Sequence, residues 1–175
     1  MSFIIRICRH FKNKDTFILL YNGLVRSRLE HASVIWNSLC LMYVESIEKI
    51  QKRFLRYLYF RDCGIYPYYS RNPVSSQELM TKYDFITLQK RRDHADCIFL
   101  FKIMNSLIDC SVILENINIR VNLKQTRHQH LFIVDNNRSP LNRMMRILNE
   151  KNYDPFHSMS HFKNELKHDF FVCFV

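Results

Sequence analysis

Glycine and proline are scarce in this sequence, with two and four occurrences among its 175 residues. Turn-rich β-sandwiches need many such residues, and glycine-rich phosphate-binding loops need several glycines close together. The two glycines, Gly23 and Gly64, stand far apart in the chain. Both of these protein classes are therefore excluded, and a mainly helical chain is favoured.

Long apolar runs and closely spaced cysteines are also missing. No apolar run approaches the roughly 20 residues of a membrane-spanning helix, and Arg6 and Arg9 interrupt the apolar start before a signal core forms. The six cysteines are Cys8, Cys40, Cys63, Cys97, Cys110 and Cys173. None forms a Cys-x-x-Cys pair, so neither a zinc knuckle nor a disulfide framework is expected. We expect an intracellular protein, cytoplasmic or nuclear, without a membrane partner.

Residues that could form a catalytic or metal centre are few. Adjacent aspartates of the kind that hold two magnesium ions for nucleotidyl transfer do not occur. His157 and His161 have a metal-chelating spacing, but Ser158 stands where a zinc protease carries its glutamate. Glu45 and Glu48 are each followed four residues later by lysine, which indicates ordinary surface pairing. The sequence predicts no catalytic residue, no cofactor and no metal site.

The sequence is instead rich in apolar residues and in positive charge. Apolar residues make up 47% of the chain and aromatic residues 14%, which excludes a disordered polymer. The 26 Lys and Arg outnumber the 16 Asp and Glu, for a net charge of +10. A basic folded chain of this kind indicates a polyanionic partner.

Apolar residues recur at helical spacing through most of the chain. Asn13 is a candidate N-cap for a long first helix, and Ser139 for a later one. Helices are expected over residues 2–11, 13–36, 42–60, a short stretch opening at Ser76, 86–107, 140–150 and 158–168. The stretch from Cys97 to Met104 is apolar nearly all round, which predicts the central core helix.

The pattern changes at about residue 116. Apolar and polar residues alternate from Ile117 to Leu123, which predicts a strand, and Leu131–Val134 is a candidate partner for a short β-hairpin. The expected organisation is a helical, thumb-like bundle over 1–115 and a small C-terminal region over 116–175, with the hairpin and further helices.

The clearest amphipathic element is the helix expected over 42–60. Its apolar side holds Ile47, Ile50, Phe54, Leu55 and Leu58, and its opposite side holds Lys49, Lys52, Arg53 and Arg56, with Glu45 one turn earlier. No acid occurs between Lys49 and Arg61. Cations at this spacing suit successive phosphates, although a solvated helix face has the same pattern.

The stretch 61–75 that follows carries Gly64, two prolines and three tyrosines, and it reads as a loop. It offers charge and stacking surface through Arg61, Arg71, Tyr66, Tyr68 and Tyr69. The alternative is a tyrosine-rich loop that packs on the domain.

Several strings of the sequence resemble a known family when they are taken together. They are Leu24–Asn37 (LVRSRLEHASVIWN), Glu45–Arg56 (ESIEKIQKRFLR), Phe101-Lys102, Ile108–Cys110 and Ser139–Met145 (SPLNRMM). In order and spacing they are similar to the region that follows the palm in reverse transcriptases of jockey-type non-LTR retrotransposons. The resemblance extends from about residue 3 to residue 170.

This resemblance implies a thumb and C-terminal region without the polymerase palm, which carries the family's metal-binding aspartates, and without the endonuclease domain further upstream. The chain would then be a truncated product of a transposable element, inactive by itself as an RNA-directed DNA polymerase. A thumb grips RNA or an RNA–DNA template–primer duplex by its backbone. The implied nucleic-acid contacts here are Lys49, Lys52, Arg53, Arg56 and Arg61.

Two other functions stay open at this point. The chain can be a helical protein-interaction module whose apolar faces self-associate or dock to a palm domain encoded elsewhere. It can also be a non-functional retroelement relic.

Overall fold

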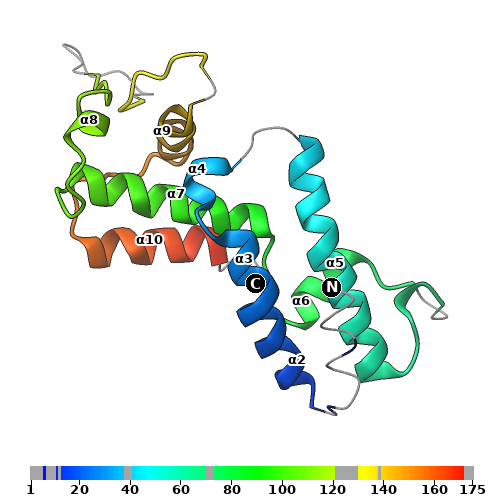
Figure 1. Cartoon of the computed structure of the whole chain (residues 1–175). Helices are drawn as coiled ribbons and strands as arrows, with labels where there is room; N and C mark the ends of the chain where they lie inside the picture. Colours follow the sequence, from blue (N-terminus) through cyan, green and yellow to red (C-terminus); the bar gives the residue numbers. More distant parts are fainter. Residues whose placement is uncertain are drawn as a thin grey trace. The chain divides into compact units, whose positions relative to one another are not determined.

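The structure is a computed structural model (Figure 1). It describes residues 6, 11, 13–37, 41–69, 73–120, 130–137 and 139–171, and for Leu41 the backbone only. These residues are mainly helical and contain no extended strand, so the predicted mainly-α fold is confirmed. Unit 1 comprises Met1–Ala32 and Ser38–Gln89, and unit 2 comprises Ser33–Asn37 and Lys90–Val175. The helix expected over 2–11 lies almost wholly outside the described residues.

Unit 1 begins with α2 (Lys14–Tyr21), a π-helical turn η2 (Asn22–Arg26) and α3 (Ser27–Glu30). Asn13 caps α2 as expected, since its side-chain oxygen accepts a 2.8 Å hydrogen bond from the Asp15 N–H. The single helix expected to run as far as Trp36 is interrupted, because Ala32 adopts a positive φ of 52°. The residues after this break form α4 (Ser33–Trp36) in unit 2.

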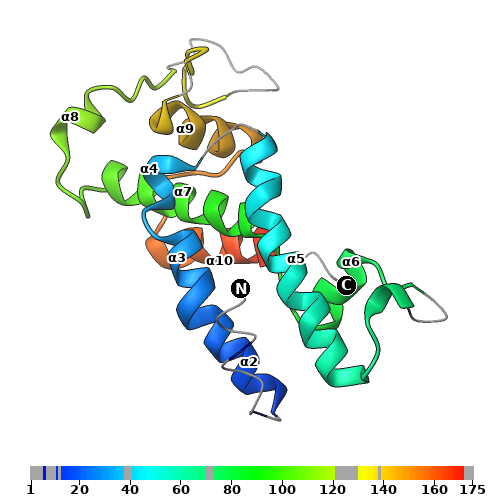
Figure 2. The same ribbon diagram turned by 45° about the vertical axis from the view of Figure 1, so that its right-hand side comes forward.

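The longest helix of unit 1 is α5 (Leu41–Cys63), which contains the range predicted for it (Figures 1 and 2). Its residues Phe54, Leu55 and Leu58 are fully buried. The Phe54 ring stacks on Tyr21 of α2 with centroids 4.1 Å apart. The short helix α6 (Ser76–Lys82) also packs on α5; it begins at Ser76 as predicted, and Ser75 caps it. Burial of this apolar face fixes which side of α5 is exposed.

Glu48 corrects one prediction about α5. Its side chain is buried, and its carboxylate accepts a 2.8 Å hydrogen bond from the Gln89 N–H. Gln89 lies in the first turn of α7 (Leu88–Met104), whose free N–H groups and helix dipole favour a negative charge. The prediction of surface pairing was wrong for Glu48, since spacing within α5 cannot reveal that the start of α7 lies beside it. Among the described residues Glu45 makes no ion pair with Lys49.

Unit 2 is built from α7, α9 (Pro140–Lys151) and α10 (Met159–Phe171), with α4 and the short α8 (Ser111–Leu114). Helices α7 and α10 lie side by side in both views (Figures 1 and 2). Its buried core comprises Cys97, Leu100, Phe101, Phe132, Met144, Met145, Leu148, Tyr153, Phe162, Leu166 and Phe170. The second half of α7 contributes Cys97, Leu100 and Phe101 to it, as predicted for a central core helix.

The predicted hairpin in the C-terminal region is not supported as a pair of strands: among the described residues its two segments meet in one antiparallel bridge, between Ile119 and Phe132. On the side away from this bridge, the Phe132 N–H donates to the side-chain oxygen of Asn149 at 2.9 Å. The side-chain amide of Asn149 donates to the Phe132 carbonyl, also at 2.9 Å. Asn149 of α9 therefore takes the place of a further strand. Residues 121–123 of the expected strand lie outside the described residues.

The two units divide the chain at positions other than the expected boundary between residues 115 and 116. That boundary falls inside unit 2, which begins its main segment at Lys90 and also takes in Ser33–Asn37. The reason is packing, since α7 supplies core residues to α9 and α10 while α4 contacts α9.

Candidate nucleic-acid interface

The exposed side of α5 gathers four of the five cations that the sequence singles out. Lys49 and Arg53 are exposed, and Lys52 and Arg56 are half-buried. At about 100° per residue the four side chains fall within an arc of about 100° around the helix axis. The fully buried Phe54, Leu55 and Leu58 lie on the other side of the helix.

The positive charge on this face is not neutralised by neighbouring acids. In the part of the chain that the structure describes, Lys49, Lys52 and Arg53 make no ion pair, not even with the exposed Glu45 one turn away. Some other cations do have an acidic partner, as where Lys82 meets Asp62 at 3.2 Å. We call Lys49, Lys52, Arg53 and Arg56 the basic face of α5.

Arg61, the fifth predicted contact, does not belong to this face. Its position is about 120° around the helix axis from Lys49. Its guanidinium donates a 2.7 Å hydrogen bond to the Phe11 carbonyl and lies 5.2 Å from the centroid of the Phe17 ring. Arg61 therefore links α5 to the N-terminal part of unit 1.

A short tyrosine segment follows α5 and lies against its C-terminal half. Tyr66 stacks on Phe60 of α5 with ring centroids 4.4 Å apart, and the 3-10 turn η3 (Pro67–Tyr69) comes next. The Arg56 guanidinium lies 5.0 Å from the centroid of the Tyr68 ring. Tyr66, Tyr68 and Tyr69 are exposed, whereas Arg71 lies outside the described residues.

The other charged groups near the end of α5 bind one another. Asp62 accepts a 2.9 Å hydrogen bond from the Tyr83 hydroxyl as well as the contact from Lys82. The Tyr83 hydroxyl and the Lys82 ammonium lower the pKa of Asp62. Lys82 also donates a 3.3 Å hydrogen bond to the Cys63 sulfur. This network joins α5 to α6 and does not extend the basic face.

Unit 2 contains a buried polar cluster that sequence reasoning did not find. Arg143 binds Asp96 with its Nε at 2.8 Å and its Nη2 at 3.3 Å, and it donates to the carbonyls of Asn37 at 2.6 Å and Val34 at 2.7 Å. Asn37 donates to Asp96 at 3.1 Å and accepts from Arg92 at 3.1 Å. Burial raises the pKa of Asp96, and the hydrogen bonds and charge of Arg143 oppose that shift.

This buried cluster ties α4, α7 and α9 together, so its role is in folding. Asn37 and Arg143 lie in the stretches Leu24–Asn37 and Ser139–Met145 respectively. The only sequence signal was Asp96, an acid directly before the apolar half of α7.

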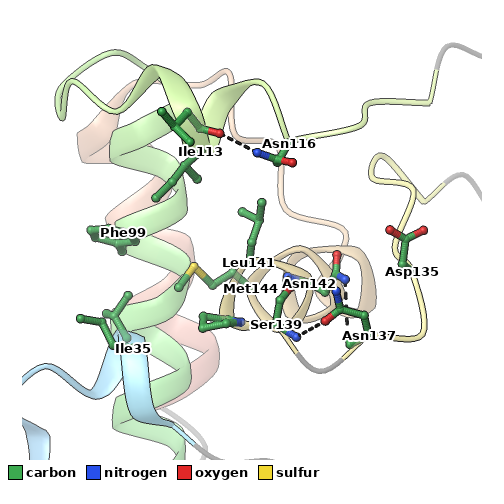
Figure 3. A pocket seen from close by; sticks show the side chains of 13 residues that line it. Ile35, Phe99, Ile113, Asn116, Asp135, Asn137, Ser139, Leu141, Asn142 and Met144 are labelled. Atoms are coloured by element: carbon green, nitrogen blue, oxygen red, sulfur yellow. Dashed lines mark hydrogen bonds between the residues drawn. The ribbon is translucent and has the colours of Figure 1, made fainter.

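A cavity of about 550 Å³ opens within unit 2 (Figure 3). Apolar side chains of α4, α7, α8 and α9 form much of its wall, among them Ile35, Phe99 and Met144. Asp135, Asn137 and Asn142 gather toward another side in Figure 3. Its described lining residues include no Lys or Arg, so it does not suit a phosphate.

The two histidines with metal-chelating spacing stand at the start of α10. Their rings are 4.7 Å apart between centroids, and each meets its own acid, His157 with Asp154 at 3.6 Å and His161 with Glu165 at 3.7 Å. Across the residues that the structure describes, no three His, Cys, Asp or Glu side chains are placed to hold a metal ion. No helix in the same residues has the length and apolar character needed to cross a bilayer.

Comparison with known proteins finds no match to this chain among family models, curated proteins or solved structures. The site is therefore interpreted from its own geometry, and the family resemblance stays a prediction.

Proposed function

We propose that this chain is a thumb-like and C-terminal fragment of a non-LTR retrotransposon reverse transcriptase that binds RNA or an RNA–DNA duplex through the phosphate backbone. The basic face of α5 makes the contact, and the chain carries out no polymerisation by itself. The observation that supports this proposal is the set of four cations on one exposed helix side without ion-pair partners among the described residues.

The physical basis is the release of counterions from the polyanion. Cations three or four residues apart on a helix are about 5–6 Å apart, which suits contacts to successive phosphates. Each neutralised phosphate of a duplex contributes about 0.9 to the slope of log affinity against log salt, so four contacts give about 3.6. Affinity would then fall on the order of 100-fold between about 50 and 200 mM salt. Backbone contacts carry no sequence information, so binding is sequence-tolerant.

The family resemblance and the basic face of α5 fall on the same stretch of sequence. The string Glu45–Arg56 contains the whole basic face, and it also contains Phe54 and Leu55 of the buried core. One helix can therefore pack on its neighbours and present cations at the same time.

The test is fluorescence anisotropy with a short RNA–DNA hybrid across a salt series. The variant changes Lys49, Lys52, Arg53 and Arg56 to Gln. Its matched control removes the same charge from four exposed cations elsewhere, Lys14, Arg28, Lys163 and Lys167. We expect the first variant to lose about 3–4 from the slope and the control to lose much less.

Two outcomes would contradict the proposal. Equal binding by both variants would make the basic face an ordinary solvated surface. Magnesium-dependent extension of a primer, abolished by EDTA, would show catalytic chemistry that these residues do not provide.

A second candidate function is self-association with another copy of this chain. It is favoured by large apolar side chains that unit 1 leaves in solvent, with exposed fractions of 70% at Leu19 and 71% at Met42. Sedimentation velocity over a range of concentrations tests it, and a monomer at high concentration would refute it.

A further inference from the structure

We infer that the tyrosine segment beside α5 binds unpaired bases, so that the preferred ligand is a nucleic acid with a single-stranded stretch. The tyrosine segment is Tyr66, Tyr68 and Tyr69, with Pro67 between them. This inference rests on the proposed function, because the basic face of α5 must first hold the phosphate backbone.

The first observation is the exposure of these rings. The exposed fractions of Tyr66, Tyr68 and Tyr69 are 42%, 60% and 85%. Aromatic side chains normally gain stability by burying their large apolar surface, so three exposed tyrosines within four residues leave that gain unused. A ligand with flat apolar faces would bury this ring surface and so gain the corresponding stability.

The second observation is that the backbone of the segment is fixed. Pro67 is buried in unit 1, and its carbonyl accepts a 3.3 Å hydrogen bond from the Val74 N–H. The Tyr69 N–H donates to the Tyr66 carbonyl at 2.9 Å, which closes the turn. The rings are therefore held out on a defined turn, which lowers the entropy lost when a ligand stacks on them.

The third observation is the position of the rings next to the basic face. The Arg56 guanidinium lies 5.0 Å from the Tyr68 centroid, so a phosphate bound by Arg56 brings its own nucleotide close to that ring. Phe60 falls within the same arc of α5 as the four cations, and Tyr66 stacks on it at an interplanar angle of 16°. Charge and aromatic surface thus form one continuous strip along α5.

Stacking on protein rings requires bases that are free to leave the helical stack. The bases of a duplex are already stacked on one another, whereas those of a single strand or an overhang are not, and every base has a face suitable for tyrosine. A junction between duplex and single strand satisfies both parts of the strip, with paired backbone on the cations and unpaired bases on the tyrosines.

The experiment compares four labelled probes by anisotropy: a blunt RNA–DNA hybrid, the same hybrid with an overhang of about ten nucleotides, an abasic version of that overhang, and the single strand alone. The variant is Tyr68→Ala with Tyr69→Ala. The control is Tyr43→Ala, which removes a tyrosine with a similar exposed fraction of 62% near the N-terminal end of α5. Circular dichroism checks that each variant folds, and Tyr69→Ala alone serves as the mildest version.

We expect wild type to bind the overhang more tightly than the blunt or abasic probe. Loss of a stacked base corresponds to roughly 5- to 100-fold in affinity. The tyrosine variant should show this loss on the overhang and on the single strand but not on the blunt or abasic probe, with an unchanged salt slope, and Tyr43→Ala should bind as wild type does.

The outcomes separate this inference from the proposed function. Salt-dependent binding that is equal for all probes and unaffected by the tyrosine variant would overturn the inference and leave the basic-face contact standing. Absence of salt-dependent binding to every probe would overturn both.

Discussion

Replacing Arg143 by Met is expected to destabilise unit 2 by about 3–5 kcal/mol, the cost of removing one partner from a buried ion pair. Asp96 is fully buried, so the change leaves its carboxylate with the Asn37 amide and no direct charge partner from α9. The carbonyls of Val34 and Asn37 lose their donors at the same time. The loss of these two donors is part of that cost, since an orphaned buried carbonyl accounts for about 1–3 kcal/mol.

A double change, Arg143→Met with Asp96→Leu, separates these contributions. It removes the carboxylate that has lost Arg143 but leaves both carbonyls without their donor and takes away the charge that faces the buried Arg92. The difference in cost from Arg143→Met alone therefore measures the net contribution of the Asp96 charge. The assay is urea unfolding followed by circular dichroism. Arg146→Met in the same helix is the control, because Arg146 takes no part in the cluster. If Arg143→Met and the control differ by less than about 1 kcal/mol, the cluster does not hold unit 2 together in the way described.

Two further predictions concern pH and helix capping. Burial against Phe170 and Phe171, with the charge of Arg91, lowers the pKa of His94 from 6.5. The neutral imidazole therefore contributes fully to the stability of the folded protein above pH 6.5, and this contribution is lost as the pH falls toward the pKa of the folded state. His94→Phe should flatten the dependence of unfolding free energy on pH between 7.5 and 5, measured in urea, and an unchanged slope would count against this assignment. Ser75→Ala should cost unit 1 about 1 kcal/mol by removing the cap of α6, while the neighbouring Ser76→Ala should cost less; equal effects would refute the cap.

The sequence predicts features whose causes are local. The range of α5 follows from apolar spacing, and the starts of α2 and α9 follow from Asn13 and Ser139, whose side chains bond N–H groups two or three residues later. These interactions join residues close together in the sequence, so they can be predicted without the rest of the fold. The basic face of α5 belongs to the same class, because residues on one helix share a side by geometry alone.

The features that the sequence did not reveal depend on distant partners. Asp96 and Arg143 are 47 positions apart, and nothing near either residue indicates the other. The alternation after Ile117 is a genuine period-two pattern, yet within the described residues it forms a single bridge to Phe132, whose other side binds Asn149 of α9 instead of a further strand. Arg61 lies next in sequence order to the basic face, but the Phe11 carbonyl and the Phe17 ring hold it elsewhere.

The assignment of Ser33–Asn37 to unit 2 affects how fragments of this protein are expected to fold. Ser33–Asn37 belongs to unit 2, although unit 1 residues come before and after it. A fragment cut at Lys90 would therefore carry Arg143 and Asp96 but lack the carbonyls and the amide that complete their cluster. A fragment ending at Gln89 would keep α4 with nothing to pack against. Proteolysis or truncation at that point should leave the core of unit 1 complete, whereas the C-terminal piece needs Ser33–Asn37 to complete its buried cluster.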